Sequence, residues 1–392
     1  MLRPVLAGVV TALVGFGGAF TIVLAGLRAV GADEQQAASG LLVLCVASGM
    51  VAVAVGLRTR MPVGIAWSTP GAALLIAAGR PPGGFAAAVG AFLLCGVLVV
   101  LSGLVRPLGG LIEVIPPPIA GAMLAGVLLP LCVAPMKAVA EVPALAVPVL
   151  VVWAVVGRFA RPWSVPAALV AAVVGIVVTE PGLGGAELVP ALVWTAPRFE
   201  PATLIGVGLP LFLVTMASQN VPGMAVLATY GYRPRLGPIL LATGLGTLGA
   251  APFGGHAVNL AAISAALAAG PDADPDPGRR WVASVTAGVG LAVLGLGAGL
   301  ATALILLSPP VLVTAVAGLA LLGALAAALA SAVAEPAQRE AAAVTFVVTA
   351  AGVPFLGIGA AFWRLLAAGA TVLLHRRRAA PAARVASASR RA

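Results

Sequence analysis

Apolar runs long enough to cross a lipid bilayer recur along the whole chain, and they restrict its fold more than any other feature. Two examples are FAAAVGAFLLCGVLVVLSGL at residues 85–104 and WVASVTAGVGLAVLGLGAGLATALILL at residues 281–307. A helix of about 20 apolar residues spans the hydrocarbon core. Only 9% of the 392 residues are charged, against about 25% in ordinary soluble domains. We therefore predict an all-α polytopic membrane protein without a soluble domain.

The first apolar segment is open to two interpretations. Arg3 followed by an apolar run resembles the start of a signal peptide. The run continues beyond residue 20 and many spans follow, so we favour a first transmembrane helix. The three cysteines, Cys45, Cys95 and Cys132, lie in apolar runs without the spacing of metal ligands, and we expect small buried side chains.

Polar or Pro/Gly-rich breaks divide the sequence into about fourteen apolar segments, and the basic residues favour every second break. With Arg3 inside, these breaks contain Arg58, Arg60, Arg106, Arg158, Arg161, Arg233, Arg235, Arg279, Arg280 and Arg339, whereas Arg28, Arg80, Lys137 and Arg198 fall on the other side. Because Lys and Arg mark cytoplasmic loops, we predict a bacterial-type inner membrane protein with both termini in the cytoplasm. The basic tail at residues 376–392 is interpreted as a topology anchor on anionic lipid. The net charge of +10 is then no indication of nucleic-acid binding.

Two pairs of similar stretches indicate an internal repeat. PPIAGAMLAG at residues 117–126 matches PPVLVTAVAG at 309–318, and MPVGIAWSTPGAA at 61–73 matches APFGGHAVNLAAI at 251–263. The offsets, 192 and 190 residues, nearly agree. Seven segments per copy is an odd number, so the second copy is inverted in the membrane, as in many secondary transporters.

The repeat sets the predicted boundaries. Residues 1–180 form the first copy with segments 1–7, residues 181–201 form a periplasmic linker, and residues 202–375 form the second copy with segments 8–14.

Segments 3 and 10 are predicted to be broken helices that begin near the middle of the membrane. In segment 3, Thr69 precedes Pro70, and a hydroxyl N-cap followed by proline is a strong helix start. Asn259 holds the matching place in segment 10. The helical part from Pro70 to Gly79 is about 15 Å long, half of the hydrocarbon core. Two facing helix N-termini bring partial positive charge to one point and favour an anion; close packing and kinking are the alternative reason for these glycines and prolines.

His256 lies three residues before Asn259. Ionisable groups inside a membrane are costly and usually functional, and an ordinary pKa near 6.5 suits a proton carrier. We interpret His256 as a proton carrier or substrate ligand, with a structural role as the alternative. His375, beside the arginine cluster of the tail, is expected at the interface.

A second polar cluster, Ser218, Gln219 and Asn220, interrupts segment 8 with uncharged donors that suit a carboxylate or helix packing. Aromatic rings and glycines of segments 1, 3 and 10 are expected to complete the site. The candidate substrate-binding residues are Phe16, Gly17, Phe20, Trp67, Ser68, Thr69, Ser218, Gln219, Asn220, Phe253, Gly254, Gly255, His256 and Asn259. No metal ligand and no cofactor is expected.

Five stretches resemble the benzoate/proton symporter family (BenE), and the resemblance covers nearly the whole chain except the tail. They are MPVGIAWSTPGAALL, PPPIAGAMLAGVLLPLC, LFLVTMASQNVPG, APFGGHAVNLAAI and GPDADPDPGRRW. The resemblance implies uptake of benzoate or a similar aromatic acid with protons. More distantly, it implies the inverted-repeat fold of uracil permeases and anion transporters. There a core domain of segments 1–4 and 8–11 moves against a gate domain of segments 5–7 and 12–14, and homodimers are frequent.

Nucleobase carriers of that fold use carboxylates on segments 8 and 10, where this chain has Gln219, Asn220, Gly255 and His256. The loss of fixed negative charge is consistent with an anionic substrate and leaves His256 as the proton candidate. An anion exchanger or channel of the same fold stays open as an alternative. A membrane enzyme is not favoured, because GHAVN contains neither a zinc-protease motif nor a nucleophile elbow.

Overall fold

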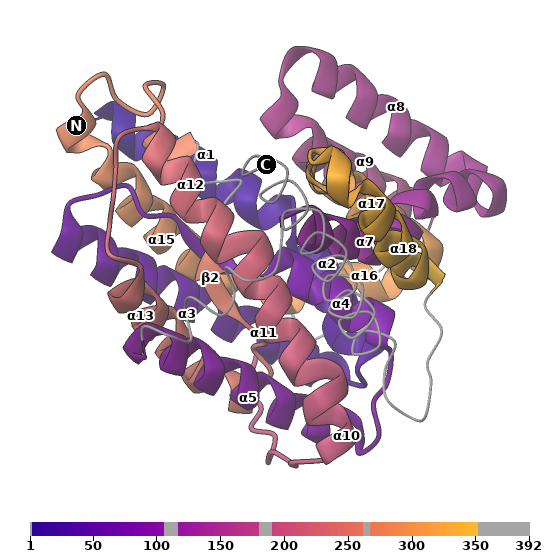
Figure 1. Ribbon diagram of the computed structural model, residues 1–392. Helices are drawn as coiled ribbons and strands as arrows, with labels where there is room; N and C mark the ends of the chain where they lie inside the picture. Colours follow the sequence, from indigo (N-terminus) through magenta and orange to yellow (C-terminus); the bar gives the residue numbers. More distant parts are fainter. Residues whose placement is uncertain (1, 106–116, 180–189, 262–266, 352–392) are drawn as a thin grey trace, which may run out of the picture.

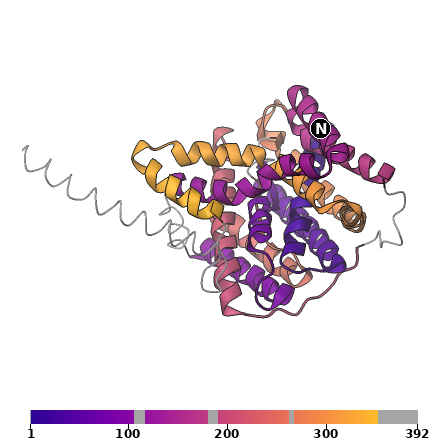
Figure 2. The ribbon, with the colours of Figure 1, turned by 90° about the vertical axis from the view of Figure 1, so that its right-hand side faces the viewer.

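The computed structural model describes residues 2–105, 117–179, 190–261 and 267–351 of the chain (Figures 1 and 2). Most of these residues are helical. The longer helices are α1 (Leu2–Gly17), α2 (Phe20–Ala29), α3 (Glu34–Thr59), α4 (Thr69–Ala78), α5 (Gly84–Leu104), α7 (Pro117–Glu141), α8 (Pro143–Phe159), α9 (Ser164–Thr179), α11 (Leu209–Thr215), α12 (Val221–Thr229), α13 (Leu236–Ala250), α15 (Trp281–Gly295), α16 (Ala298–Leu307), α17 (Pro310–Val333) and α18 (Arg339–Ala351). The short elements are the strands β1 (Ile65–Trp67) and β2 (Val258–Leu260), the helical turn α10 (Pro201–Thr203), the π-helical segments η2 (Leu204–Gly208) and η3 (Met216–Asn220), and the 3₁₀ turns η1 (Arg161–Trp163), η4 (Ala251–Phe253), η5 (Pro277–Arg279) and η6 (Pro336–Gln338).

The described residues contain eight helices or continuous helix groups that are long and apolar enough to cross a membrane, and nine if the bent pair around α15 and α16 counts as one span. The helical multi-pass class predicted from the apolar runs is therefore confirmed. The count of fourteen segments stays a prediction. The predicted last segment and the basic tail lie outside the described residues.

The helices pack into two groups (Figures 1 and 2). In the first group α3 packs against α15, α5 against α13, and α1 against α15. In the second group α7 packs against α17 and α18, and α8 packs against α9. The short helices α2 and α4 pack against each other between the groups, since α2 also contacts α17 and α4 also contacts α7.

Three of the segments that carry basic residues lie together on one side of the molecule. The guanidinium carbon of Arg60 lies 5.0 Å from the ring centre of Trp281, and the Tyr232 hydroxyl donates to the Pro277 carbonyl at 2.7 Å. These contacts join the loop after α3, the loop after α12 and the start of α15. We refer to this face as the basic side.

The stretch at residues 190–200, which precedes α10, lies at the other side. The Val193 N–H donates to Ser39 Oγ at 3.0 Å near the start of α3, whereas Arg60 follows the end of that helix. A helix of 26 residues is about 39 Å long, so the two contacts are separated by the thickness of a membrane. The Arg198 N–H donates to the Ala86 carbonyl at 2.9 Å, at the start of α5.

Two short strands meet where segments 3 and 10 are interrupted. β1 and β2 pair antiparallel, and further backbone bonds flank the pair, from Ser68 N–H to the Ala257 carbonyl and from Ala261 N–H to the Gly64 carbonyl, both at 2.9 Å. Each unpaired backbone group in a membrane interior costs several kcal/mol. The strand pairing therefore makes a non-helical backbone tolerable at this depth. We refer to this paired region as the crossing.

The sequence placed the helix caps at the crossing incorrectly. Ser68, not Thr69, is the N-cap of α4, because its Oγ accepts from the Gly71 N–H at 3.1 Å. Asn259 is not an N-cap, since it lies in β2 opposite Ala66. Both caps were predicted from a polar residue near an expected helix start. Such a residue does not show how far the preceding extended strand continues. Residues 262–266, which follow β2 by one residue, lie outside the described part of the chain.

Buried polar side chains complete the hydrogen bonding of β2. Asn220 Oδ1 accepts from the Leu260 N–H at 3.0 Å, and Thr247 Oγ1 accepts from the Val258 N–H at 3.0 Å. Asn220 and Thr247 are both fully buried. They thus satisfy two strand N–H groups that would otherwise have no water to bind.

We predict that Asn220→Leu destabilises the protein by roughly 1–3 kcal/mol, because the Leu260 N–H then loses its buried acceptor. The measurement is thermal unfolding of the purified protein in detergent. Ser48→Ala is the control, since the Ser48 hydroxyl is buried and has no partner among the described residues. Equal unfolding temperatures for the two variants would contradict the role assigned to Asn220.

A close helix contact gives a second stability prediction. A Cβ added at Gly318 of α17 would lie 2.1 Å from the Leu131 carbonyl oxygen of α7, whereas at Gly323 of the same helix it would meet nothing within 4 Å. Gly318→Ala is expected to cost roughly 1–3 kcal/mol through overpacking. Gly323→Ala is expected to be neutral or slightly stabilising because alanine favours helix. The same unfolding assay compares them, and a neutral Gly318→Ala would contradict the packing of α17 on α7.

Candidate functional site

A cavity of about 1020 Å³ lies between the two helix groups. At one end it is lined by the crossing, with Trp67 and Thr69, and by Gln219 of η3. Arg158 and Arg161, which are both exposed, also line it. The volume is at the upper end of the range for small-molecule sites, so the cavity is the best candidate for a substrate pathway.

Three of the predicted substrate-binding residues line this cavity: Trp67, Thr69 and Gln219. Thr69 is the first residue of α4 and stands at the positive end of that helix dipole. Thr69 and Pro70 are the residues of this helix end that line the cavity. Because the Gly71 N–H is bound by Ser68 and Pro70 has no N–H, Thr69 is the one of the two that has groups able to donate to a ligand.

Ser68 supports the site from behind. Its side chain is fully buried, and its Oγ accepts from the Thr215 hydroxyl at 2.9 Å in addition to the Gly71 N–H. It does not line the cavity. Ser68 therefore joins α4 to α11, and its contribution to the site is the position of Thr69.

The predicted polar cluster of segment 8 separates into different roles within η3. Gln219 lines the cavity, whereas Asn220 binds β2 and also donates from Nδ2 to Met216 Sδ at 3.1 Å. Ser218 is half-buried and lies outside the cavity lining. Single-turn π segments in long helices often occur at functional sites, and this one has its strand-binding and cavity-lining side chains in adjacent positions.

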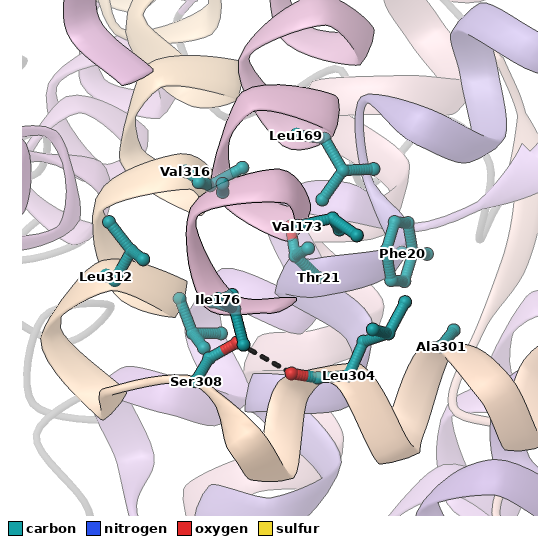
Figure 3. A pocket seen from close by; sticks show the side chains of 12 residues that line it. Phe20, Thr21, Leu169, Val173, Ile176, Ala301, Leu304, Ser308, Leu312 and Val316 are labelled. Carbon is teal, nitrogen blue, oxygen red and sulfur yellow. Dashed lines mark hydrogen bonds between the residues drawn. The ribbon is translucent and has the colours of Figure 1, made fainter. Parts of the chain in front are cut away.

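Aromatic rings connect the large cavity with a second, small pocket. Phe16 stacks on Phe20 with ring centres 5.0 Å apart and meets Trp67 edge-on at 6.2 Å. Phe20 lines an apolar pocket of about 30 Å³ between α2, α9, α16 and α17. Figure 3 shows Phe20 and Val173 pointing toward one another there. Of these three rings Trp67 alone lines the large cavity. Gly15 of α1 and Gly18, which follows α1, also line it, whereas the predicted Gly17 does not.

Three further predicted residues lie on the side opposite the basic loops. The Phe253 ring packs edge-on against Trp194 at 5.4 Å, and its carbonyl accepts from Ser39 Oγ at 2.9 Å. Gly254 has φ +93°, a conformation that favours glycine. Neither these residues nor Gly255 line the cavity, so the structure does not bring them to the site.

His256 is fully buried and does not line the cavity. Its Nδ1 accepts from the Ala257 N–H at 2.7 Å, and its ring meets Phe92 of α5 edge-on at 6.3 Å. Its Nε2 has no partner in the described part of the chain. His256 thus lies directly before β2 in the packed interior. Asn259 is likewise buried in β2, outside the cavity lining.

Sequence reasoning missed Arg158 and Arg161 as cavity residues. Both were interpreted only as markers of a cytoplasmic loop, and nothing in a single sequence shows that the turn between α8 and α9 lies beside the opening of this cavity. No group of three or more His, Cys, Asp or Glu suited to a metal ion occurs in the described residues.

Comparisons with known proteins identify the chain's relatives. Residues 2–374 match the family described as benzoate membrane transport protein, BenE. The inner membrane protein YdcO of Escherichia coli strain K12 is 36% identical over 367 residues, 93% of each chain. The benzoate membrane transport protein of Acinetobacter baylyi is 30% identical over 368 residues, 92% of each chain.

Solved structures show a similar fold. The transmembrane domain of the cyanobacterial bicarbonate transporter BicA matches with a TM-score of 0.56 at 18% identity, over 95% of this chain and 96% of the other. SLC26A9 matches with a TM-score of 0.53 at 15% identity, over 93% of this chain and 64% of the other. Together with the apolar helices, the relatives place the chain in the inner membrane as a multi-pass transporter rather than an enzyme. The chain belongs to the BenE family of benzoate membrane transport proteins.

Proposed function

We propose that the protein imports benzoate or a related aromatic carboxylate together with a proton. The observation that carries this proposal is the inner end of the cavity, where the Trp67 ring and the N-terminal residue of α4, Thr69, line the same space. A flat apolar surface beside a helix N-terminus is complementary to an aromatic ring bearing a carboxylate. The relative from Acinetobacter baylyi, a benzoate membrane transport protein, supports the same substrate class.

In the proposed complex the carboxylate lies at Thr69, and Gln219 orients it from η3. The dipole of α4 supplies favourable charge without a fixed cation, and no Asp or Glu among the described residues lines the cavity to repel the anion. The ring lies against Trp67, whose edge contact with Phe16 holds its orientation.

The two helix groups are the proposed moving parts. We assign segments 1–4 and 8–11 to a core domain that carries the crossing, and segments 5–7 and 12–14 to a gate domain. We assign residues 1–180 and 202–375 to the two inverted copies and residues 181–201 to the periplasmic linker, with both termini in the cytoplasm. Because basic loops mark the cytoplasm, we assign the turn with Arg158 and Arg161 to the cytoplasmic side. In this proposal the cavity opens inward, and movement of the core would expose the crossing to the outside.

His256 is the proposed proton site. Its Nδ1 accepts from the Ala257 N–H, and a protonated Nδ1 has no lone pair for that bond. Protonation would therefore alter the backbone directly before β2, which links the proton to the geometry of the crossing. A monoanion carried with one proton moves no net charge, so the pH gradient alone would drive uptake.

An anion exchanger of the same fold is the alternative function. It uses the same cavity and helix dipole and needs no titrating histidine. The position of His256 outside the cavity lining is the observation that keeps this alternative open.

Uptake of labelled benzoate into proteoliposomes tests the coupling. With acid outside, the wild type is expected to accumulate benzoate whether or not the membrane voltage is clamped. His256→Gln is expected to lose accumulation but to keep benzoate exchange, because the substrate contacts remain. Accumulation that survives in this variant would remove His256 from the proton path. Benzoate exchange that ignores the pH gradient in the wild type would favour the exchanger, and absence of any benzoate flux would contradict the proposed substrate.

A second variant tests the binding position. Thr69→Val keeps the shape of the side chain and removes its hydroxyl, and it is expected to raise the KM for benzoate about tenfold, the equivalent of roughly 1.4 kcal/mol. Thr314→Val is the matched control, because Thr314 is a half-buried residue of α17 that does not line the cavity and whose hydroxyl donates to the Pro310 carbonyl of its own helix. Equal KM values in initial-rate uptake would place the carboxylate elsewhere.

A further inference from the structure

The formal charge among the described residues that line the cavity comes from two arginines. Among the residues that line it, Arg158 and Arg161 are the formally charged ones, and both are basic. No described carboxylate forms an ion pair with either of them. Their charge is therefore not compensated by an ion pair with any described residue.

The fold holds the two arginines at the opening. Arg158 lies in the last turn of α8, and Arg161 begins the 3₁₀ turn η1 that leads into α9. The Ser164 hydroxyl donates to the Arg161 carbonyl at 2.8 Å, which fixes the turn between the two helices. Both side chains are exposed, so the guanidinium groups keep their hydration and remain available to a ligand in the cavity.

We propose that Arg158 and Arg161 form an outer carboxylate-binding site at the cytoplasmic opening of the cavity, separate from the inner site at Trp67 and Thr69. This inference rests on the proposed function. Guanidinium groups bind carboxylates with two parallel hydrogen bonds. A one-sign cavity with apolar walls also concentrates the field and raises the local concentration of anions.

The outer site acts on one face of the membrane. It raises the rate at which aromatic carboxylates enter the cavity from the cytoplasm and keeps small cations out of the inward-open state. Its effect decreases with salt, because exposed charges are screened beyond about 8–10 Å at physiological ionic strength. Entry from the other face does not involve it.

Benzoate counterflow in membrane vesicles of both orientations tests this site. In everted vesicles, which present the cytoplasmic face, the variant Arg158→Gln/Arg161→Gln is expected to show a KM for benzoate about tenfold above that of the wild type and to lose its dependence on salt. In right-side-out vesicles its KM is expected to equal that of the wild type. Arg158→Lys/Arg161→Lys keeps the charge and is expected to retain most of the effect.

Arg233→Gln/Arg235→Gln is the matched control, because these arginines are exposed on the same side but do not line the cavity. Its KM is expected to equal that of the wild type at both faces. A Gln variant that matches the wild type in everted vesicles would overturn the outer site, and so would an equal rise of KM at both faces. Absence of benzoate counterflow in the wild type would instead overturn the proposed function and, with it, the outer site for benzoate.

Discussion

The backbone pairing of β1 with β2 is the interaction on which the rest of the structure depends. An extended chain inside a bilayer needs a partner for every N–H and carbonyl, and here two distant parts of the sequence provide partners for each other. Once the strands are paired, α4 can start in the interior of the protein, and the positive end of its dipole points toward the middle of the molecule. Buried side chains complete the crossing: Asn220 and Thr247 accept from N–H groups of β2, and Ser68 caps α4.

This arrangement separates the polar groups that hold the fold from those that meet the cavity. Asn220 and Ser68 are buried behind the crossing, whereas Gln219 and Thr69, their neighbours in sequence, line the cavity. This division suits the proposed function. The structural hydrogen bonds would stay occupied while a substrate enters and leaves, and no carboxylate among the described lining residues would have to be neutralised for an anion to bind.

Several features could be predicted from the sequence because they follow from local chemistry. The apolar runs predicted a helical multi-pass protein. The Thr-Pro sequence predicted a helix starting at Pro70 with Thr69 as its cap, one residue later than the observed start and cap. The alternation of basic loops agrees with the contacts that join Arg60 to Trp281 and Tyr232 to Pro277.

The remaining features depend on contacts between distant segments. Asn259 was predicted as a helix cap because the sequence does not show that β2 continues to Leu260 in order to pair with β1. The orientation of Gln219 toward the cavity and of Asn220 toward β2 is set by a partner strand 40 residues later. Arg158 and Arg161 line the cavity only because α8 and α9 pack beside it. The local sequence pattern predicts the broken helix, but tertiary contacts decide which of the nearby residues line the cavity.

The central claim is that an aromatic carboxylate binds at the inner end of the large cavity. The most direct test is a structure of the protein with 4-iodobenzoate, in which the anomalous signal of iodine locates the ring. The account predicts iodine in the cavity beside Trp67, with the carboxylate directed toward Thr69 and Gln219. Iodine in the small pocket beside Phe20, or next to His256 in the packed interior, would contradict it.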